Sequence, residues 1–142
     1  MKFENTRVFR LNFKNFKQGS AVTIPGIGIF IGNGFEKDLN LLRHEFGHLL
    51  QFQKWGFFFF WKNIASTSLK SARFSRKKHF QHQQTWTEWS ANWLSFHYFD
   101  LPADWDFERF PITPEKETAY SKPKFSENNE DFFNQWVLSD KI

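Results

Sequence analysis

Two histidines and a glutamate in His44-Glu45-Phe46-Gly47-His48 have the types and spacing of a metal site. On a helix, residues four apart share one face, with Cβ atoms about 5–6 Å apart. This separation lets both imidazoles reach one Zn²⁺ at about 2.0–2.1 Å. Glu45 then lies beside the metal without ligating it, where a general base that takes a proton from water belongs. The segment therefore predicts zinc ligands at His44 and His48 and a catalytic role for Glu45.

The surrounding sequence predicts the helix that this spacing requires, over about 37–55. Gly56 stands where a glycine often ends a helix. Gly47 inside the helix costs about 1 kcal/mol against alanine, so we expect another segment to pack closely against it. The alternative is an amphipathic helix in which the two histidines are ordinary polar groups. The apolar stripe that would face a core consists of Leu39, Leu42, Phe46 and Leu49.

A catalytic zinc site needs a third protein ligand, and the chain has no cysteine to supply it. A second predicted helix, about 85–99, carries Glu88, with Asn92 one turn later in a position to hold a ring nitrogen of a ligand histidine. Thr85-Trp86-Thr87-Glu88 is also a capping box, in which Glu88 would accept from the Thr85 amide instead. Both interpretations stay open, and the upstream motif favours Glu88 as the ligand. The other donors considered are His79, His82, His97 and Asp100.

The elements that must position these residues indicate an α+β domain, with a small sheet beside two ligand-bearing helices. Residues 3–16 predict a first strand, and Ala21 to Ile31 a second. Pro25 cannot donate a hydrogen bond within a sheet, so this second strand should lie at an edge or contain a bulge at Pro25-Gly26. Gly32-Asn33-Gly34 predicts a turn before the histidine helix.

The rest of the chain predicts connections and packing. Phe57 to Trp61 should be core or a packing platform, and the basic stretch 62–83 a polar, partly helical connection. The aromatic stripe of the second helix should be core, and consists of Trp86, Trp89, Trp93 and Phe96. We expect 1–142 to form a single domain, with the motif-bearing core at about 20–100. Residues 101–142 should be an irregular extension with a short helix near 127–138.

Composition narrows the class of protein. The net charge of +4 over 142 residues does not by itself argue for nucleic acid. No nucleic-acid partner is therefore expected, although Arg73 to Lys78 keeps a weaker nucleic-acid hypothesis open. The N-terminus lacks the apolar stretch of a signal peptide. The longest apolar run, Gly56 to Trp61, is too short to span a bilayer. A cytoplasmic protein without a membrane span is therefore the expectation.

The motif at 44–48, followed by Glu88-Trp89-Ser90-Ala91-Asn92, resembles the gluzincin branch of zinc metallopeptidases, the thermolysin-like group. The resemblance covers roughly 20–100. It implies a zincin-like fold, zinc ligands His44, His48 and Glu88, and Glu45 as the catalytic base. It also implies that Ile27 to Ile31 is an edge strand along which a peptide substrate binds as an added strand. Asn92 stands where the family often has aspartate.

The expected function is hydrolysis of peptide or amide bonds by water that zinc activates and Glu45 deprotonates. The alternative is a metallopeptidase-like module that acts in protein–protein interaction without turnover. A transition-state oxyanion also needs a hydrogen-bond donor besides zinc. The sequence does not choose among four candidates, namely His82, His97, Tyr98 and Tyr120.

Overall fold

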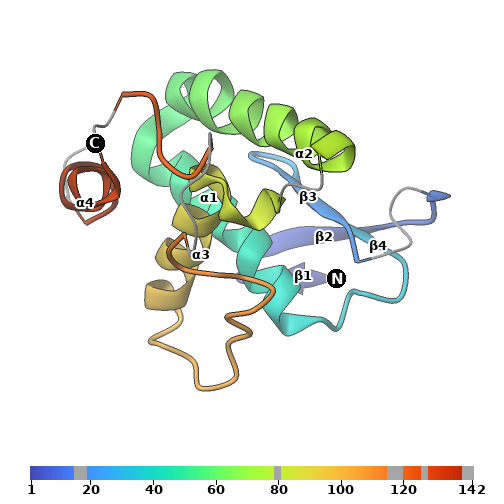
Figure 1. Cartoon of the computed structure of the whole chain (residues 1–142). Coiled ribbons are helices and arrows are strands. Elements are labelled where there is room, and N and C mark those ends of the chain that lie inside the picture. Colours follow the sequence, from blue (N-terminus) through green and yellow to red (C-terminus); the bar gives the residue numbers. More distant parts are fainter. Residues whose placement is uncertain (15–18, 79–80, 115–119, 126–127, 139–142) are drawn as a thin grey trace.

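The structure, a computed structural model, describes residues 1–14, 19–78, 81–114, 120–125 and 128–138. A small mixed sheet formed early in the chain is followed by helices, which gives the α+β class predicted from the sequence (Figure 1). None of the helices within these ranges has the length and apolar character needed to cross a membrane.

The sheet has four strands in the order β1-β2-β4-β3. β2 pairs with β4 in parallel, and the two outer pairs are antiparallel. The strand predicted over 3–16 is divided by a tight turn in which Glu4 and Asn5 adopt positive φ, and 15–16 lie outside the described residues. The strands are β1 (Lys2–Phe3), β2 (Thr6–Leu11), β3 (Ala21–Ile24) and β4 (Gly28–Gly32).

The single strand predicted over Ala21 to Ile31 is wrong, because the chain reverses at Pro25-Gly26 and forms a hairpin. Gly26 takes φ 84°, a conformation that glycine adopts at little cost, and Ile27 N donates to Ile24 O at 3.0 Å. β4 consequently lies between β2 and β3. The prediction of an edge strand at Ile27–Ile31 is therefore also wrong, and β3 is the strand at that edge of the sheet.

The histidine helix is α1 (Leu39–Phe59), and Asp38 caps it by accepting from Leu41 N at 3.1 Å. Gly56 breaks the helical path with φ 84° and ψ 174°, at the position where the sequence predicted a helix end. The chain then continues through a π-helical stretch, Phe60–Ala65, into α2 (Ser66–Lys78).

The polar connection predicted over 62–83 is therefore mostly helix. No glycine or proline interrupts 57–78, and the exposed Lys and Arg side chains of this stretch are compatible with helix. The aromatic segment Phe57–Trp61 divides between core and surface. Phe60 is buried, whereas Phe57, Phe58 and Trp61 are exposed.

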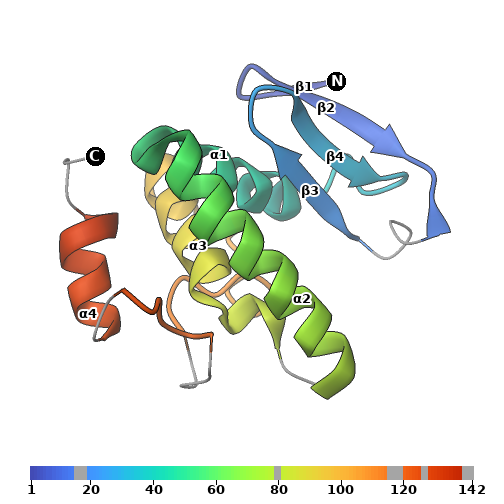
Figure 2. The same ribbon diagram turned by 90° about the horizontal axis from the view of Figure 1, so that it is seen from above.

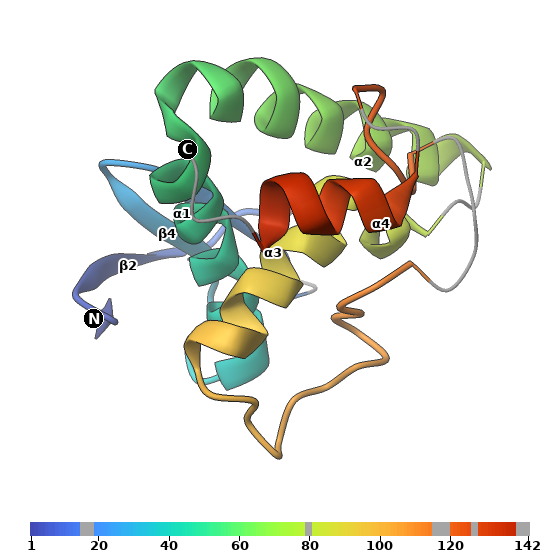
Figure 3. The same ribbon diagram turned by 90° about the vertical axis from the view of Figure 1, so that its left-hand side faces the viewer.

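α1 is the central element, with the sheet on one side and α3 (Trp86–Tyr98) on the other (Figure 2). The predicted helix at 85–99 is thus confirmed. α4 (Asn129–Phe132) continues into a π-helical turn, Phe133–Val137, and packs against α3 (Figure 3). The core between these helices contains Trp55, Phe60, Ile64, Trp86, Trp89, Phe132 and Val137.

Candidate metal centre

The site lies where α1 and α3 approach each other most closely. A Cβ atom added to Gly47 would collide with the backbone carbonyl of Ala91, so only glycine allows this separation. Gly47 lies between the two histidines of α1, and Ala91 lies between Glu88 and Asn92 of α3. The expected close packing against Gly47 is confirmed, and it brings Glu88 and Asn92 to the histidine face.

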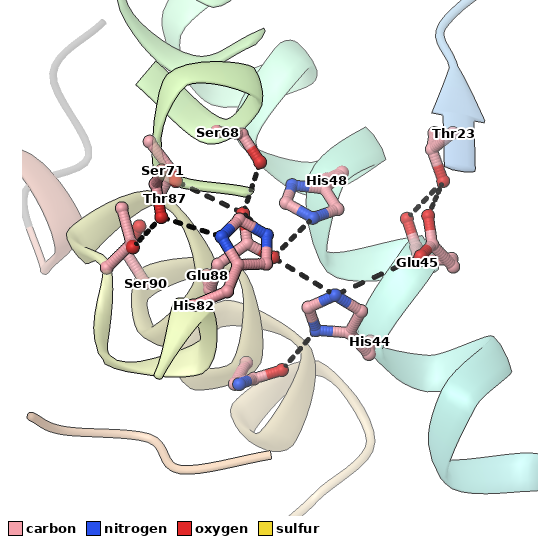
Figure 4. Close-up of polar contacts among 12 residues, drawn as sticks. Thr23, His44, Glu45, His48, Ser68, Ser71, His82, Thr87, Glu88 and Ser90 are labelled. Carbon is pink, nitrogen blue, oxygen red and sulfur yellow. Dashed lines mark hydrogen bonds and ion pairs between the residues drawn. The ribbon is translucent and has the colours of Figure 1, made fainter. Parts of the chain in front are cut away.

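The three predicted ligands converge in the buried space between the helices (Figure 4). Nε2 of His44 lies 3.3 Å from Glu88 Oε2, and Nε2 of His48 lies 3.5 Å from the same oxygen. One donor atom from each of the three side chains falls within 4.8 Å of the others. The cluster could hold a metal ion, and within the described residues no second group of this kind occurs.

Two buried amides fix which ring nitrogen of each histidine faces the cluster. Asn92 Nδ2 donates to the Pro111 carbonyl at 2.9 Å, so Asn92 Oδ1 accepts from His44 Nδ1 at 2.6 Å. Gln51 Nε2 donates to the Thr87 carbonyl at 2.7 Å, so Gln51 Oε1 accepts from His48 Nδ1 at 2.8 Å. In its neutral form each imidazole therefore carries its hydrogen on Nδ1, which leaves Nε2 for a ligand bond.

Glu88 does not act as a capping-box residue, although α3 begins at the position that would allow it. The Thr85 amide donates to the His82 carbonyl at 2.9 Å instead. Glu88 Oε1 accepts from Ser68 Oγ at 2.5 Å and from Thr87 Oγ1 at 3.1 Å. Both donors bind Oε1, and the other oxygen, Oε2, is directed at His44 and His48.

Charges within the cluster shift two pKa values in opposite directions. Burial lowers the pKa of His48, but the charge and hydrogen bonding of Glu88, aided by Glu45 and Gln51, raise it from 6.5 to about 9. Burial raises the pKa of Glu88, but the positive charges of His82 and His48 and hydrogen bonds from His44 and His48 hold it well below its ordinary 4.5. A metal ion bound here at neutral pH would replace a proton on His48.

The predicted base, Glu45, is buried beside the three predicted ligands and contacts the sheet at Thr23. Thr23 Oγ1 of β3 lies 2.7 Å from Glu45 Oε2 and 2.9 Å from the Glu45 carbonyl (Figure 4). Glu45 Oε1 lies 3.9 Å from His44 Nε2. The carboxylate thus has one oxygen beside the hydroxyl of β3 and the other turned toward the cluster.

The other sequence candidates divide by position. His82 lies beside the cluster, with Nε2 3.5 Å from Glu88 Oε1 and Nδ1 2.7 Å from Ser71 Oγ. His97 is exposed, and its ring packs against Trp93. Tyr98 Oη donates to Glu4 at 3.3 Å. Asp100 follows the end of α3, and His79 lies outside the described residues.

Several contributors to the site were missed in the sequence. Gln51 and Thr23 carry only weak signals, since an amide one turn after a histidine and a threonine in a strand are both common. The segment after 101, expected to be a mere extension, reaches the centre. The Phe110 ring lies 5.1 Å from the His44 ring between centroids, and the Pro111 carbonyl orients Asn92.

No protein-family model matches the chain, and comparison with curated proteins and with solved structures gives no match either.

Proposed function

We propose that this chain is a zinc-dependent hydrolase of peptide or amide bonds, built on a zincin-like arrangement. The observation that carries the proposal is the convergence of His44 Nε2, His48 Nε2 and Glu88 Oε2, with Glu45 Oε1 at their side. Two imidazoles and one carboxylate form a donor set that zinc prefers in catalytic sites, whereas Mg²⁺ and Ca²⁺ prefer oxygen donors. The hydrogen-bonded Nδ1 atoms support the same choice, because ligand histidines usually donate their second N–H.

His44, His48 and Glu88 would hold the zinc, and Asn92 and Gln51 keep the two rings in the ligating orientation. When bound, zinc polarises a carbonyl group and lowers the pKa of water toward neutrality. Glu45 takes a proton from the attacking water and passes it to the leaving amine. Because Thr23 holds Oε2, Oε1 is the oxygen that carries this proton.

The edge of β3 is the surface that best suits an extended peptide substrate. Gly32 N donates to Ser20 O at 3.1 Å, which makes Ser20 and Gly32 a hydrogen-bonded pair. In an antiparallel pair, hydrogen-bonded and non-hydrogen-bonded positions alternate along each strand. The backbone N–H and C=O groups of Ala21 and Thr23 fall at the positions in between, and therefore point away from β4. A peptide added at this edge would lie beside the strand whose Thr23 side chain contacts the proposed base.

The test is hydrolysis of a peptide mixture, read by mass spectrometry, for the wild type and the Glu45→Gln variant. We expect the variant to keep its zinc and to lose activity by about 10²–10⁴-fold, because it lacks the proton acceptor. Glu108→Gln changes an exposed glutamate elsewhere and should leave activity unchanged. If the zinc-loaded wild type cleaves no peptide, the hydrolase proposal is wrong, and the alternative of an interaction module without turnover is favoured. If Glu45→Gln cleaves as well as the wild type, the assigned base is wrong.

A further inference from the structure

Positive charge is concentrated in one uninterrupted part of the chain. From 46 to 87 there is no Asp or Glu, and seven of the chain's 19 Lys and Arg residues lie there. The rest of the chain contains the other twelve Lys and Arg residues and all 15 Asp and Glu residues. The segment is therefore strongly basic, and the remainder of the chain is mildly acidic. The net charge of +4 does not show this uneven distribution.

Most of this charge lies on one exposed helical surface. Lys62, Lys70, Arg73, Arg76 and Lys77 are all exposed, and their spacing over four turns keeps them on the outer side of the helix that runs through α2. Figure 2 shows α2 as the element nearest the viewer, with no other helix or strand drawn across it. We call the exposed side of residues 57–77 the aromatic–basic face.

The same face begins with a protruding group of aromatic rings. Phe57, Phe58 and Trp61 are 59, 85 and 40% exposed. Leu69, 61% exposed, continues the apolar character into α2. Exposure of this much apolar surface in water is unfavourable, and contiguous exposed apolar groups of this kind mark interaction sites.

We propose that the aromatic–basic face binds the surface of membranes rich in anionic lipids. Large apolar side chains next to lysine and arginine on one helical surface are the combination that inserts into the headgroup region while the charges contact lipid phosphates. Gly56 redirects the chain just before this face, and so places Phe57 and Phe58 at its end.

The packing of the rings favours lipid over single-stranded nucleic acid. Phe57 meets Phe58 at an interplanar angle of 87° and Trp61 at 61°. In these edge-to-face contacts the edge of one ring covers part of the face of another, whereas successive bases require open ring faces on which to stack. Leu69 adds an aliphatic group that provides no stacking surface.

Membrane docking would also place the metal centre close to the lipid surface. On its opposite side, α2 directs Ser68 at Glu88 and Ser71 at His82. The docking surface and the wall of the proposed site are thus two faces of one helix. The proposal itself depends only on the exposed residues and stands independently of zinc binding or hydrolysis.

The experiment is co-sedimentation of the full chain with phosphatidylcholine vesicles, with and without phosphatidylglycerol, at two salt concentrations. We expect binding to the anionic vesicles that weakens with salt. The double variant Phe58→Ser/Trp61→Ser should lower the partition coefficient by about tenfold or more. Arg73→Gln and Lys77→Gln should lower it by about fivefold for each charge removed.

Two controls separate this surface from general effects. Phe13→Ser removes a phenylalanine that is 64% exposed outside the face and should bind as the wild type does. His48→Ala, checked for folding by circular dichroism, should also bind vesicles normally, so loss of the metal site and loss of docking are distinguishable. Absence of sedimentation with anionic vesicles, equal binding by the Phe58→Ser/Trp61→Ser variant, or binding of single-stranded RNA in place of vesicles would each overturn the proposal.

Discussion

Replacing Gly47 by alanine would add a methyl group where α1 and α3 cross. The added Cβ would collide with the carbonyl oxygen of Ala91, and also lie within 3.1 Å of its Cα. These atoms belong to the backbone of a helix, so a change of rotamer cannot relieve the contact. The two helices must move apart, and with them the ligands on either side of the crossing.

Two effects of opposite sign determine the change in stability. Alanine is favoured over glycine inside a helix by about 0.8–1.0 kcal/mol. Overpacking in a close-packed interior costs about 1–3 kcal/mol, and a backbone collision belongs at the upper end of that range. The expected net loss is therefore about 1–2 kcal/mol of unfolding free energy. For a domain of this size, that lowers Tm by about 3–8 °C.

The same displacement should weaken metal binding. Ligand distances must stay within about 0.2 Å of their ideal values, whereas the helices must separate by more than this. We expect zinc affinity to fall by about tenfold or more, comparable to losing an outer hydrogen bond to a ligand.

Thermal unfolding of the metal-free protein measures the change in stability. Competition with a zinc-sensitive dye measures the change in zinc affinity. Gln53→Ala, which changes an exposed residue of α1, is the matched control and should alter neither value. A Gly47→Ala protein that is as stable as the wild type and binds zinc as tightly would refute the close-approach argument.

Four further predictions concern the residues of the site. Zinc binding at pH 7.5, followed by calorimetry in buffers of different ionisation enthalpy, should release about one proton, because the pKa of His48 is about 9 in the metal-free protein. The stability that this protonation gives the metal-free protein is complete below pH 6.5 and is lost as pH rises through 9; equal stability at both ends would contradict it. Asn92→Ala should weaken zinc binding by about 10–100-fold without abolishing it, measured by the dye; unchanged affinity would contradict its role. Thr23→Val should cost about 1–3 kcal/mol in urea unfolding, because the buried Glu45 carboxylate loses a donor; no change would remove the proposed tether.

The sequence predicted the parts of the site that depend on helical spacing. His44 and His48 share a face because they are four residues apart, and so do Glu88 and Asn92. Gly47 then indicated that a second element approaches closely. These four residues and one glycine were sufficient to predict a cluster that could hold a metal ion, although not to establish its metal or its chemistry.

The sheet was harder to predict because Pro25-Gly26 is compatible with both a bulge and a hairpin turn. With a bulge, residues 21–32 would form one continuous strand, whereas with a hairpin turn they form the antiparallel pair β3 and β4. The local sequence does not distinguish between these two arrangements. The consequence was large, since the hairpin moves the sheet edge from β4 to β3.

Contacts between distant segments could not be predicted from the sequence either. The Thr23–Glu45, Gln51–Thr87 and Asn92–Pro111 hydrogen bonds join residues 19 to 36 positions apart. No periodicity connects them, and each depends on how the elements pack. The extent of the helix over 57–78 was underestimated for another reason, since 62–83 was predicted to be only partly helical. Its serines and lysines are typical of a solvent-exposed connection, and its apolar residues show only weak helical periodicity.

The most direct test of the central claim is the zinc content of the purified protein by elemental mass spectrometry, for the wild type and Glu88→Ala at matched folding by circular dichroism. The described cluster predicts about one zinc per wild-type chain and little in Glu88→Ala. Full zinc content in Glu88→Ala would contradict the assignment of Glu88 as a ligand. No zinc in either protein after reconstitution would contradict the metal centre itself.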